Sequence, residues 1–324
     1  MAKPRVAFYW CASCGGCEEA VVDLNEDILQ LADTVDIVFW PVALDFKQKD
    51  IEVMKDGGIT VSFINGAVRL KEQEEMVRLL RQKSDLVVAF GACAHLGGIP
   101  GLGNFLDRDA IFQWVYQDAP SVINPEKIIP QAKTIEDSRE FTLPEFYDTV
   151  SALDQVIPVD YYLPGCPPPP DLIMNAVNAV LTGQLPEKGA VLAPNIALCD
   201  TCPRRDSKPD KIVVKDIKRP WEIKIDPEQC FMVQGLFCYG PATRTGCGET
   251  CIRANMPCRG CFGPVDGVVD QGTKALAMFA SILGVDEEGK MPDEDIRKLI
   301  DRFPDPAGTF YRFSLPTSLL KRKR

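Results

Sequence analysis

The stretch VAFYWCASCGGCEEAVVDLNEDILQL, residues 6–31, carries the strongest indication of the fold, because its hydrophobic pattern changes period at a group of cysteines. Residues 6–10 form a short, wholly apolar run, as buried parallel strands do. Beyond Cys17, apolar residues recur at helical spacing: Val21, Leu24, Ile28 and Leu31. This spacing predicts an amphipathic helix. A strand that leads through a glycine-containing turn into a helix is the opening unit of a parallel α/β sheet.

Four further apolar runs have the length and the β-branched or aromatic content of buried strands: residues 35–40, 59–64, 86–90 and 156–159. Helices are predicted over Glu72–Lys83 and Asp171–Leu181. Strands that alternate with helices imply a parallel sheet with helices on both faces. The sequence therefore predicts an α/β fold, a doubly wound parallel sheet that resembles flavodoxin.

The α/β pattern ends near residue 185, and the rest of the chain is rich in Cys, Gly and Pro. We expect a flavodoxin-like domain over residues 1–185 and a second, mostly irregular and helical domain over residues 186–324. A proline-containing stretch at about residues 107–154 is expected to be an insertion with some helix of its own. The second domain is expected to fold around metal clusters, because each cluster supplies cross-links that a small apolar core would not.

The chain carries a formal net charge of −10, which argues against nucleic acid or an anionic membrane surface as a partner. No secretory signal is visible near the first residue, so we expect a cytoplasmic protein. The uncharged residues 86–106 are long enough to span a bilayer. They contain a proline, an asparagine and five glycines, so we expect no membrane span but a buried strand that runs into a glycine-rich loop.

Thirteen cysteines are many for a cytoplasmic chain, where disulfides are disfavoured. They lie beside Gly and Pro in expected loops, several of them as Cys-x-x-Cys pairs, which indicates metal or cluster ligation. Four follow predicted strands and should meet at the carboxyl edge of the sheet: Cys14, Cys17, Cys93 and Cys166. Eight more lie in the second domain: Cys199, Cys202, Cys230, Cys238, Cys247, Cys251, Cys258 and Cys261. These twelve suffice for three four-ligand sites and leave Cys11, which is expected to be a buried thiol.

Zinc and iron–sulfur clusters both use Cys-x-x-Cys pairs. The spacings here are irregular, and one site is assembled from three distant strand ends, which favours iron–sulfur clusters over the regular knuckles of a zinc protein. Spacing alone leaves open which of the eight later cysteines share a site. With a single histidine, His95, the chain offers no Ser-His-Asp or Cys-His pair for nucleophilic catalysis.

Five motifs carry a resemblance to a known family: CGGCEE, GACAHLGGIPG, PGCPPP, CYGPATRTGC and PCRGC, in this order. Together they resemble the small subunits of [NiFe]-hydrogenases. They are most similar to the small (G) subunits of the cytoplasmic F420-non-reducing, or methyl viologen-reducing, hydrogenases that associate with heterodisulfide reductase. The resemblance covers essentially the whole chain, including GTFYRFSLP at residues 308–316.

The resemblance implies three [4Fe-4S] clusters in a line. The proximal cluster would be held by Cys14, Cys17, Cys93 and Cys166. The medial cluster would be held by Cys247, Cys251, Cys258 and Cys261, and the distal cluster by Cys199, Cys202, Cys230 and Cys238. These twelve cysteines would be the iron ligands, and no catalytic residue is expected on this chain.

The resemblance also implies that the chain is a subunit of an oxidoreductase that acts on hydrogen, in organisms that carry out methanogenesis. Hydrogen would react at the NiFe centre of a separate large subunit. Electrons would then pass through this chain to a small iron–sulfur adaptor (delta-type) subunit and a heterodisulfide reductase-like flavoprotein. Two alternatives stay open: a relay subunit in a related complex whose large-subunit homologue lacks NiFe, and the small subunit of the F420-reducing branch.

Three positions depart from the exported members of the family. Cys199 stands where many of them have a histidine ligand, and Cys251 can complete a four-cysteine medial site where they often have proline. More thiolate ligation generally lowers the reduction potential, which suits low-potential electron delivery. Oxygen-tolerant members have an additional cysteine where this chain has Gly16, so no such tolerance is expected.

Three further residues have open roles. Glu18 either relays protons near a subunit interface or, as we favour, is a first-turn carboxylate that interacts with the helix dipole. His95 is expected to pack in its loop, or to bond to a cluster sulfur or a partner subunit, rather than to bind iron. Arg259, within PCRGC, either tunes the medial cluster or is solvated.

Overall fold

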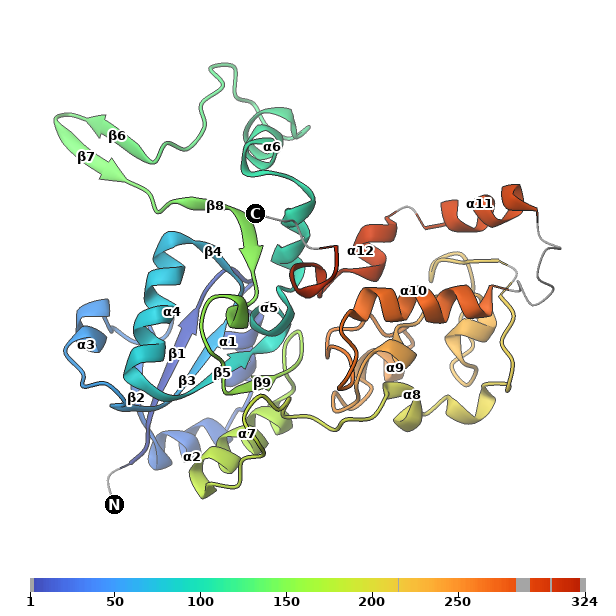
Figure 1. Ribbon diagram of the computed structural model, residues 1–324, viewed down its shortest axis with the longest axis horizontal. Helices are drawn as coiled ribbons and strands as arrows, with labels where there is room; N and C mark the ends of the chain where they lie inside the picture. Colours follow the sequence, from blue (N-terminus) through green and yellow to red (C-terminus); the bar gives the residue numbers. More distant parts are fainter. Residues whose placement is uncertain (1–2, 215, 284–291, 304, 321–324) are drawn as a thin grey trace.

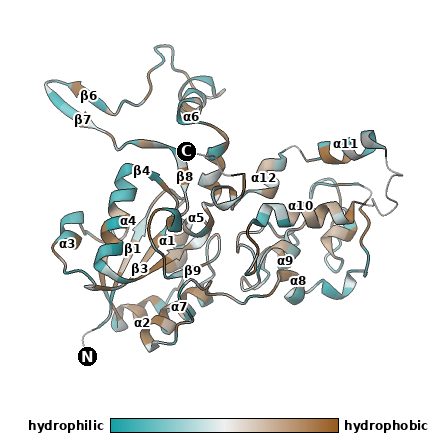
Figure 2. Cartoon of the chain, viewed as in Figure 1, coloured by the Kyte–Doolittle hydropathy of each residue, from teal (hydrophilic) through white to brown (hydrophobic). Residues whose placement is uncertain are grey.

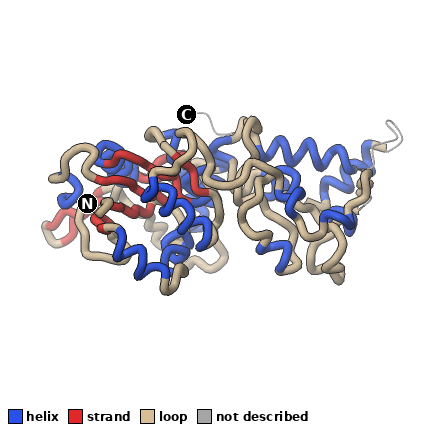
Figure 3. The backbone as a smooth tube through the Cα atoms, turned by 90° about the horizontal axis from the view of Figure 1, so that it is seen from below, coloured by secondary structure: helices blue, strands red, loops and turns tan. Residues whose placement is uncertain are grey.

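The computed structural model describes residues 3–214, 216–283, 292–303 and 305–320. Figure 1 shows two bodies side by side, a sheet flanked by helices and a second body of helices and loops. In the view of Figure 3 the strands lie in the first of these bodies and the second is drawn as helix and loop. None of the described helices is long and apolar enough to cross a membrane.

The central sheet has five parallel strands in the order β2-β1-β3-β5-β9. Their bounds are Arg5–Trp10 for β1, Asp36–Phe39 for β2, Ile59–Asn65 for β3, Ser84–Phe90 for β5 and Tyr161–Leu163 for β9. This is the strand order of the flavodoxin-like doubly wound fold. The predicted fold class is therefore confirmed.

Helices cover both faces of the sheet. Their bounds are Gly16–Val22 for α1, Asp27–Thr34 for α2, Gln48–Glu52 for α3, Lys71–Lys83 for α4, Gly91–Leu96 for α5 and Pro170–Thr182 for α7. Apolar residues of α1, α2 and α7 form one core cluster with the strands, and those of α3, α4 and α5 form another with the opposite face. Figure 2 shows largely apolar strands and a mostly hydrophilic α4, as expected of a helix with one face in solvent.

Three local predictions were wrong. The helix expected after Cys17 is two helices, α1 and α2, with Asn25 at a φ of 53° between them. The glycine-rich loop expected after β5 is helical, since α5 is followed by a 3-10 helix over Ile99–Phe105. The run at residues 156–159 is not a strand. It contains Pro158, which has no N–H for a sheet ladder, and the strand begins later as β9.

The expected insertion contains the predicted helix and also a hairpin that the sequence did not indicate. α6, Arg108–Gln113, continues into a π-helix over Trp114–Asp118. The hairpin pairs β6, Lys133–Glu136, with β7, Arg139–Thr142, and every residue of both strands is exposed. β8, Phe146–Ser151, then pairs antiparallel with β4, Val68–Leu70. Figure 1 shows the hairpin projecting away from the sheet.

The second body is built from short elements. Its helices are α8, Leu198–Thr201; α9, Thr250–Arg253; α10, Gln271–Ile282; α11, Asp293–Asp301; and α12, Pro306–Phe310. Its own apolar cluster centres on four phenylalanine rings with neighbouring centroids 5.0–6.1 Å apart: Phe237, Phe279, Phe303 and Phe310. The domain boundary near residue 185 stays a prediction.

Residues near the end of the chain return to the sheet-bearing body. The backbone N–H of Gly98 donates to Phe313 O (2.9 Å), and Gln155 Nε2 donates to Pro316 O (2.8 Å). Phe313 also packs on Leu96 of α5, with Cys261 beside it. The two bodies are therefore joined next to the helix that carries Cys93.

Candidate iron–sulfur centres

The first cysteine pair lies where β1 passes into α1. Ser13 holds this turn, because its hydroxyl donates to Asn65 Oδ1 (3.1 Å) and accepts from the N–H of Gly15 (3.3 Å). Gly15 has a φ of 84°, a left-handed conformation that favours glycine. The turn leaves Cys14 exposed and buries Cys17 in the first turn of α1.

Two further cysteines follow β5 and β9. Cys93 lies in the first turn of α5, directly after β5, and its thiol accepts a hydrogen bond from the backbone N–H of Ile99. Cys166 lies in the loop between β9 and α7. Both strands are parallel to β1, so their carboxyl ends open on the same edge of the sheet as Cys14 and Cys17.

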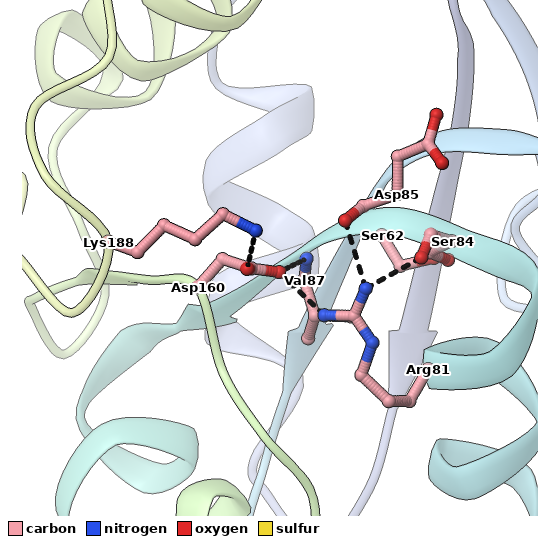
Figure 4. A network of polar contacts seen from close by, with 7 residues as sticks. All are labelled: Ser62, Arg81, Ser84, Asp85, Val87, Asp160 and Lys188. Carbon is pink, nitrogen blue, oxygen red and sulfur yellow. Dashed lines mark hydrogen bonds and ion pairs between the residues drawn. The ribbon is translucent and has the colours of Figure 1, made fainter. Parts of the chain in front are cut away.

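Asp160 anchors the start of β9, as Figure 4 shows. Its carboxylate pairs with Arg81 Nη1 (2.5 Å) and Lys188 Nζ (2.6 Å), and it accepts from the backbone N–H of Val87 in β5 (2.8 Å). Burial raises the pKa of Asp160, but the bonds from Lys188, Arg81 and Val87 outweigh burial and lower it. These contacts hold β9 against β5 and so determine where the Cys166 loop leaves the sheet.

The structure brings these four thiols into one group. Burial raises the pKa of Cys17, and the neighbouring thiols of Cys93, Cys166 and Cys14 raise it further. Burial likewise raises the pKa of Cys93 to about 12, again with Cys166 and Cys14 as neighbours. A Cβ on Gly91 would lie 2.4 Å from Cys17 Sγ, so this close approach requires glycine.

A second group of four bounds a small apolar cavity in the second body: Cys199, Cys202, Cys230 and Cys238. Cys199 lies in α8 and Cys202 directly follows it, while Cys230 precedes a 3-10 helix over Phe231–Gln234. Burial raises the pKa of Cys199 to about 12, and the Cys238 thiol adds to this. Burial raises the pKa of Cys238 to about 11.

The remaining four cysteines form a third group: Cys247, Cys251, Cys258 and Cys261. Cys251 lies in α9, and the other three lie in turns on either side of it. Burial raises the pKa of Cys261 to about 12, with the thiols of Cys166, Cys247 and Cys251 adding to this. Burial also raises the pKa of Cys258 well above its ordinary value, followed by the effect of Cys238.

Two contacts join the three groups into a line. The backbone N–H of Cys166 and the thiol of Cys166 both act on the pKa of Cys261. The backbone N–H of Cys258 lowers the pKa of Cys238, and the Cys238 thiol in turn raises that of Cys258. We therefore name the groups by their order along this line: the proximal group of Cys14, Cys17, Cys93 and Cys166, the medial group of Cys247, Cys251, Cys258 and Cys261, and the distal group of Cys199, Cys202, Cys230 and Cys238.

The medial and distal groups share a backbone feature. Four of their cysteines accept a hydrogen bond from the amide two residues later: Cys202 from Arg204, Cys238 from Gly240, Cys247 from Glu249 and Cys258 from Gly260. Hydrogen bonds of this kind favour the thiolate and tune the potential of an iron–sulfur cluster.

The chemistry of the donor sets can be compared with that of iron–sulfur ligands. Among the described residues, no three His, Cys, Asp or Glu side chains lie close enough together to hold one metal ion. Each group offers four thiols, most of them buried or partly buried, with amide N–H donors nearby. Cysteine thiolates with such donors are the ligands of [4Fe-4S] clusters, so the residues fit these cofactors.

Glu18 lies in the first turn of α1, where the helix-dipole interpretation places it, but its side chain is buried. Trp40 Nε1 donates to one carboxylate oxygen, and Asn65 Nδ2 donates to the other (2.6 Å). Burial raises the pKa of Glu18, while the bonds from Trp40 and Asn65 oppose this effect. Glu18 is thus a buried carboxylate beside Cys17.

Cys11 is buried, and His95 is partly buried. The ring of His95 lies 4.6 Å from that of Tyr162, centroid to centroid, and its Nδ1 has no hydrogen-bond partner among the described residues. Burial, followed by the nearby Arg244, lowers the pKa of His95 to about 3. Burial raises the pKa of Cys11, which confirms that it is a buried thiol.

Sequence reasoning missed Arg204. Its side chain lines the distal cavity, and the residue is only 5% exposed. Its guanidinium carbon lies 3.9 Å from the centre of the Phe231 ring. The available signal was its position two residues after Cys202, but nothing in the sequence shows that this charge is buried.

Comparison with known proteins shows the family to which the chain belongs. The family described as NADH ubiquinone oxidoreductase, 20 Kd subunit, matches residues 14–180, just over half of the chain. The iron–sulfur (G) subunit of the F420-non-reducing hydrogenase of Archaeoglobus profundus is 41% identical over 323 residues, 98% of both chains. The corresponding G subunit from Methanothermobacter thermautotrophicus is 36% identical over 322 residues, covering 99% of this chain and 97% of that one.

A solved structure agrees in fold. A chain of the [NiFeSe] hydrogenase from Desulfovibrio vulgaris Hildenborough is 20% identical, with a TM-score of 0.51, over 82% of this chain and 95% of that one. Full-length similarity to hydrogenase G subunits, a family match over the α/β half and three cysteine groups agree with one another. The chain therefore belongs to the NADH ubiquinone oxidoreductase 20 Kd subunit family and, within it, to the small (G) subunits of F420-non-reducing [NiFe]-hydrogenases, which are subunits of oxidoreductases.

Proposed function

We propose that this chain conducts electrons from the NiFe centre of a large hydrogenase subunit, through three [4Fe-4S] clusters, to a small iron–sulfur adaptor (delta-type) subunit and a heterodisulfide reductase-like flavoprotein. Hydrogen is oxidised on the large subunit, and this chain supplies only the electron path. The proposed location is the cytoplasm. The proposed process is methanogenesis, as the Methanothermobacter sources of two relatives suggest.

The proposed ligands are the three groups described above: Cys14, Cys17, Cys93 and Cys166 for the proximal cluster, Cys247, Cys251, Cys258 and Cys261 for the medial cluster, and Cys199, Cys202, Cys230 and Cys238 for the distal cluster. Clusters bound there would supply one-electron redox chemistry. The chain's own contribution is to hold twelve thiols in order, to direct amide N–H groups at several of them and to bury four of them, Cys17, Cys93, Cys238 and Cys258.

One observation supports this proposal above the others: the line is continuous. The Cys166 backbone acts on Cys261 of the medial group, and the Cys258 backbone acts on Cys238 of the distal group. Each pair of neighbouring groups therefore has a cysteine of one group beside a cysteine of the next. Sites that merely stabilise the fold, such as structural zinc, have no need of such a connection.

The open end of the line supports a large-subunit partner at the proximal group. Cys14 and Cys166 are exposed, and so are apolar side chains close to them in the chain or the fold, including Trp10 and Ile99. Exposed cluster ligands beside exposed apolar residues suit a face that a partner covers. We propose that the NiFe large subunit docks there, and that the adaptor approaches the distal group.

The test is made on the purified complex. We expect roughly twelve iron and twelve sulfide ions per chain, four of each per cluster, with EPR signals of reduced clusters. The complex should also reduce a viologen dye with hydrogen. Zinc in place of iron would exclude the electron-transfer role. A complex with clusters but neither nickel nor hydrogen uptake would exclude the hydrogenase role.

That last outcome would favour the second candidate, a relay subunit in a related complex whose large-subunit homologue lacks NiFe. The family description, a subunit of NADH ubiquinone oxidoreductase, favours this candidate for the α/β half. The match ends at residue 180, before the eight cysteines of the medial and distal groups. Because the hydrogenase relatives extend over those cysteines as well, the hydrogenase role is the better supported. Reduction of F420 by the complex would instead place the chain in the F420-reducing branch.

A further inference from the structure

Arg204 is a buried cation without a carboxylate partner among the described residues. Its Nη1 donates to the carbonyl oxygens of Asp226 (3.2 Å) and Gln229 (3.1 Å), and its Nη2 donates to Asn255 Oδ1 (2.6 Å). All three acceptors are neutral, and the Phe231 ring covers the guanidinium. A buried charge is costly unless an opposite charge compensates it. The groups available for this are the four thiols of the cavity that Arg204 lines.

The other buried cations of the described chain are placed differently. Lys83 pairs with Asp56 (3.0 Å), Arg244 pairs with Asp266 (2.7 Å), and Arg69 lies over an aromatic ring. Arg204 alone among these four lines a cysteine cavity.

Arg259 is a second positive charge beside the cysteines, and it lies at the medial group. It lies between Cys258 and Cys261 and is partly buried. Burial lowers the pKa of Arg259, and the nearby Arg312 and Arg219 lower it further, while the thiols of Cys251 and Cys238 oppose this. No carboxylate of the described residues is among these neighbours. Arg259 is therefore a positive charge between two medial cysteines in the chain, with thiols of the medial and distal groups among its neighbours.

The proximal group has no cation among its neighbours. The charged side chain beside Cys17 is Glu18, which is 5% exposed. The other side chains that act on Cys17, Cys93 and Cys166 are cysteine thiols, and no lysine or arginine is among them. The medial and distal groups also have a buried carboxylate, Glu249, which acts on Cys247 and Cys202. Unlike the proximal group, however, they have the guanidinium groups of Arg204 and Arg259 beside them.

We propose that Arg204 and Arg259 make the line electrostatically asymmetric, so that an added electron is more stable at the medial and distal groups than at the proximal group. This inference rests on the proposed function, since it requires clusters at the three groups. Moving one electron along the line moves one negative charge, and no bond forms or breaks and no proton is transferred. A fixed positive charge in a low-dielectric site lowers the free energy of the reduced state. The chain itself therefore favours flow away from the proximal group, which is the direction of hydrogen oxidation.

The experiment is a redox titration of the intact complex, in which EPR follows each cluster separately. Arg259→Gln should shift the medial midpoint potential downward, and Arg204→Gln the distal one. At a fixed ambient potential we expect the ratio of reduced to oxidised cluster to fall about tenfold, which is about 59 mV for one electron. The proximal potential should not move in either variant.

Two controls separate charge from structure. Arg204→Lys keeps the charge and should keep the distal potential near that of the natural protein. Arg297→Gln removes an exposed arginine of α11, in the same half, that is not among the neighbours of any of the proposed ligands, and should shift all potentials little. Iron content establishes that each variant carries its clusters. If Arg204→Gln does not retain its clusters, the medial potential of Arg259→Gln and the distal potential of Arg204→Lys still test the inference.

The inference is overturned if neither glutamine variant moves its cluster, if all three clusters shift together, or if Arg204→Lys shifts the distal potential as far as Arg204→Gln. Failure of the proposed function is distinguishable from these results, because the natural complex would then show no iron–sulfur signals at all.

Discussion

In the α/β half, the proximal cysteines follow three parallel strands, β1, β5 and β9, that end at the same edge of the sheet. In the second half, the medial and distal cysteines lie in loops and four-residue helices. The first arrangement is held by hydrogen bonds between strands and by two apolar clusters. The second has one apolar cluster. Both cores include proposed ligands, Cys17 in the first half and Cys238 and Cys258 in the second, but only the first half also holds its thiols at the ends of paired strands.

Each half therefore depends on its cofactors to a different degree. A parallel sheet satisfies its backbone hydrogen bonds without any cluster, so the proximal group is preformed. Short turns have few such bonds, so cluster cross-links contribute more to their stability. The halves also differ in charge, because arginines lie beside the medial and distal groups, whereas the proximal group has a buried carboxylate and no cation among its neighbours.

The largest expected effect comes from removing the iron. A chelator applied after oxidation should leave the α/β half folded and make the second half susceptible to proteolysis, because only that half would lose most of its cross-links. Limited proteolysis with mass spectrometry of the fragments measures this. Equal cleavage rates in both halves would contradict this contrast between them.

Loss of a single cysteine ligand should remove only the cluster that it binds. Cys166→Ser should lower the iron content by about one third, since one of three clusters is lost. Cys11→Ala is the matched control, because Cys11 is buried but no cysteine acts on its pKa, and it should leave the iron content unchanged. A loss of iron in the Cys11 variant would show that the ligand assignment is wrong.

The anchor of β9 should matter for stability more than for cluster chemistry. Asp160→Asn leaves Arg81 without its carboxylate partner and should lower the free energy of unfolding by about 3 kcal/mol. Denaturant unfolding, followed by the far-UV circular dichroism of the sheet, measures this. An unchanged unfolding midpoint would remove the role assigned to the network in Figure 4.

The same network predicts a pH dependence. The pKa of Asp160 is lowered in the folded chain, so its stabilisation is present above the unfolded-state value of about 3.9 and is lost as the pH falls through the lower folded-state value. Unfolding measured between about pH 5 and pH 2 should show this loss in the natural protein. Asp160→Asn should lack this contribution, and an equally steep loss in the variant would assign it to other carboxylates.

The smallest effect is expected from the projecting hairpin. Replacing residues 133–142 with a short Gly-Ser linker should change the free energy of unfolding by less than about 0.5 kcal/mol, because every residue of both strands is exposed. Urea unfolding measures this. A loss of more than about 1 kcal/mol would show that the hairpin contributes to the fold of the free chain.

Sequence patterns predicted the strands at residues 6–10, 35–40, 59–64 and 86–90, which the structure has as β1, β2, β3 and β5. Strands covered on both faces have long apolar runs, and such runs are easy to detect. β9 was misplaced because it has only three residues, two of them tyrosine. The hairpin was missed because strands that are exposed on both faces carry no alternation of apolar and polar residues.

The cysteine groups, like the strands, could be predicted only in part from the sequence. Four cysteines that follow strands could be assigned to one edge of the sheet, because parallel strands end together. The eight later cysteines could not be grouped from their spacing. Their grouping depends on how short turns pack, and the structure places Cys258 beside Cys238 and Cys261 beside Cys166.

The amino-acid sequence alone establishes the chemistry available to this protein: thirteen thiols, one histidine and a parallel α/β sheet that gathers four of the thiols at its edge. Residue types and hydrophobic periods are local properties of the chain, so they can be read without a structure. The order of the three groups is known only from the packed chain, as are the positions of Glu18 at the beginning of the line and Arg204 at its end. Burial, and with it the energy of a charge, depends on segments that are distant in sequence and meet only when the chain packs.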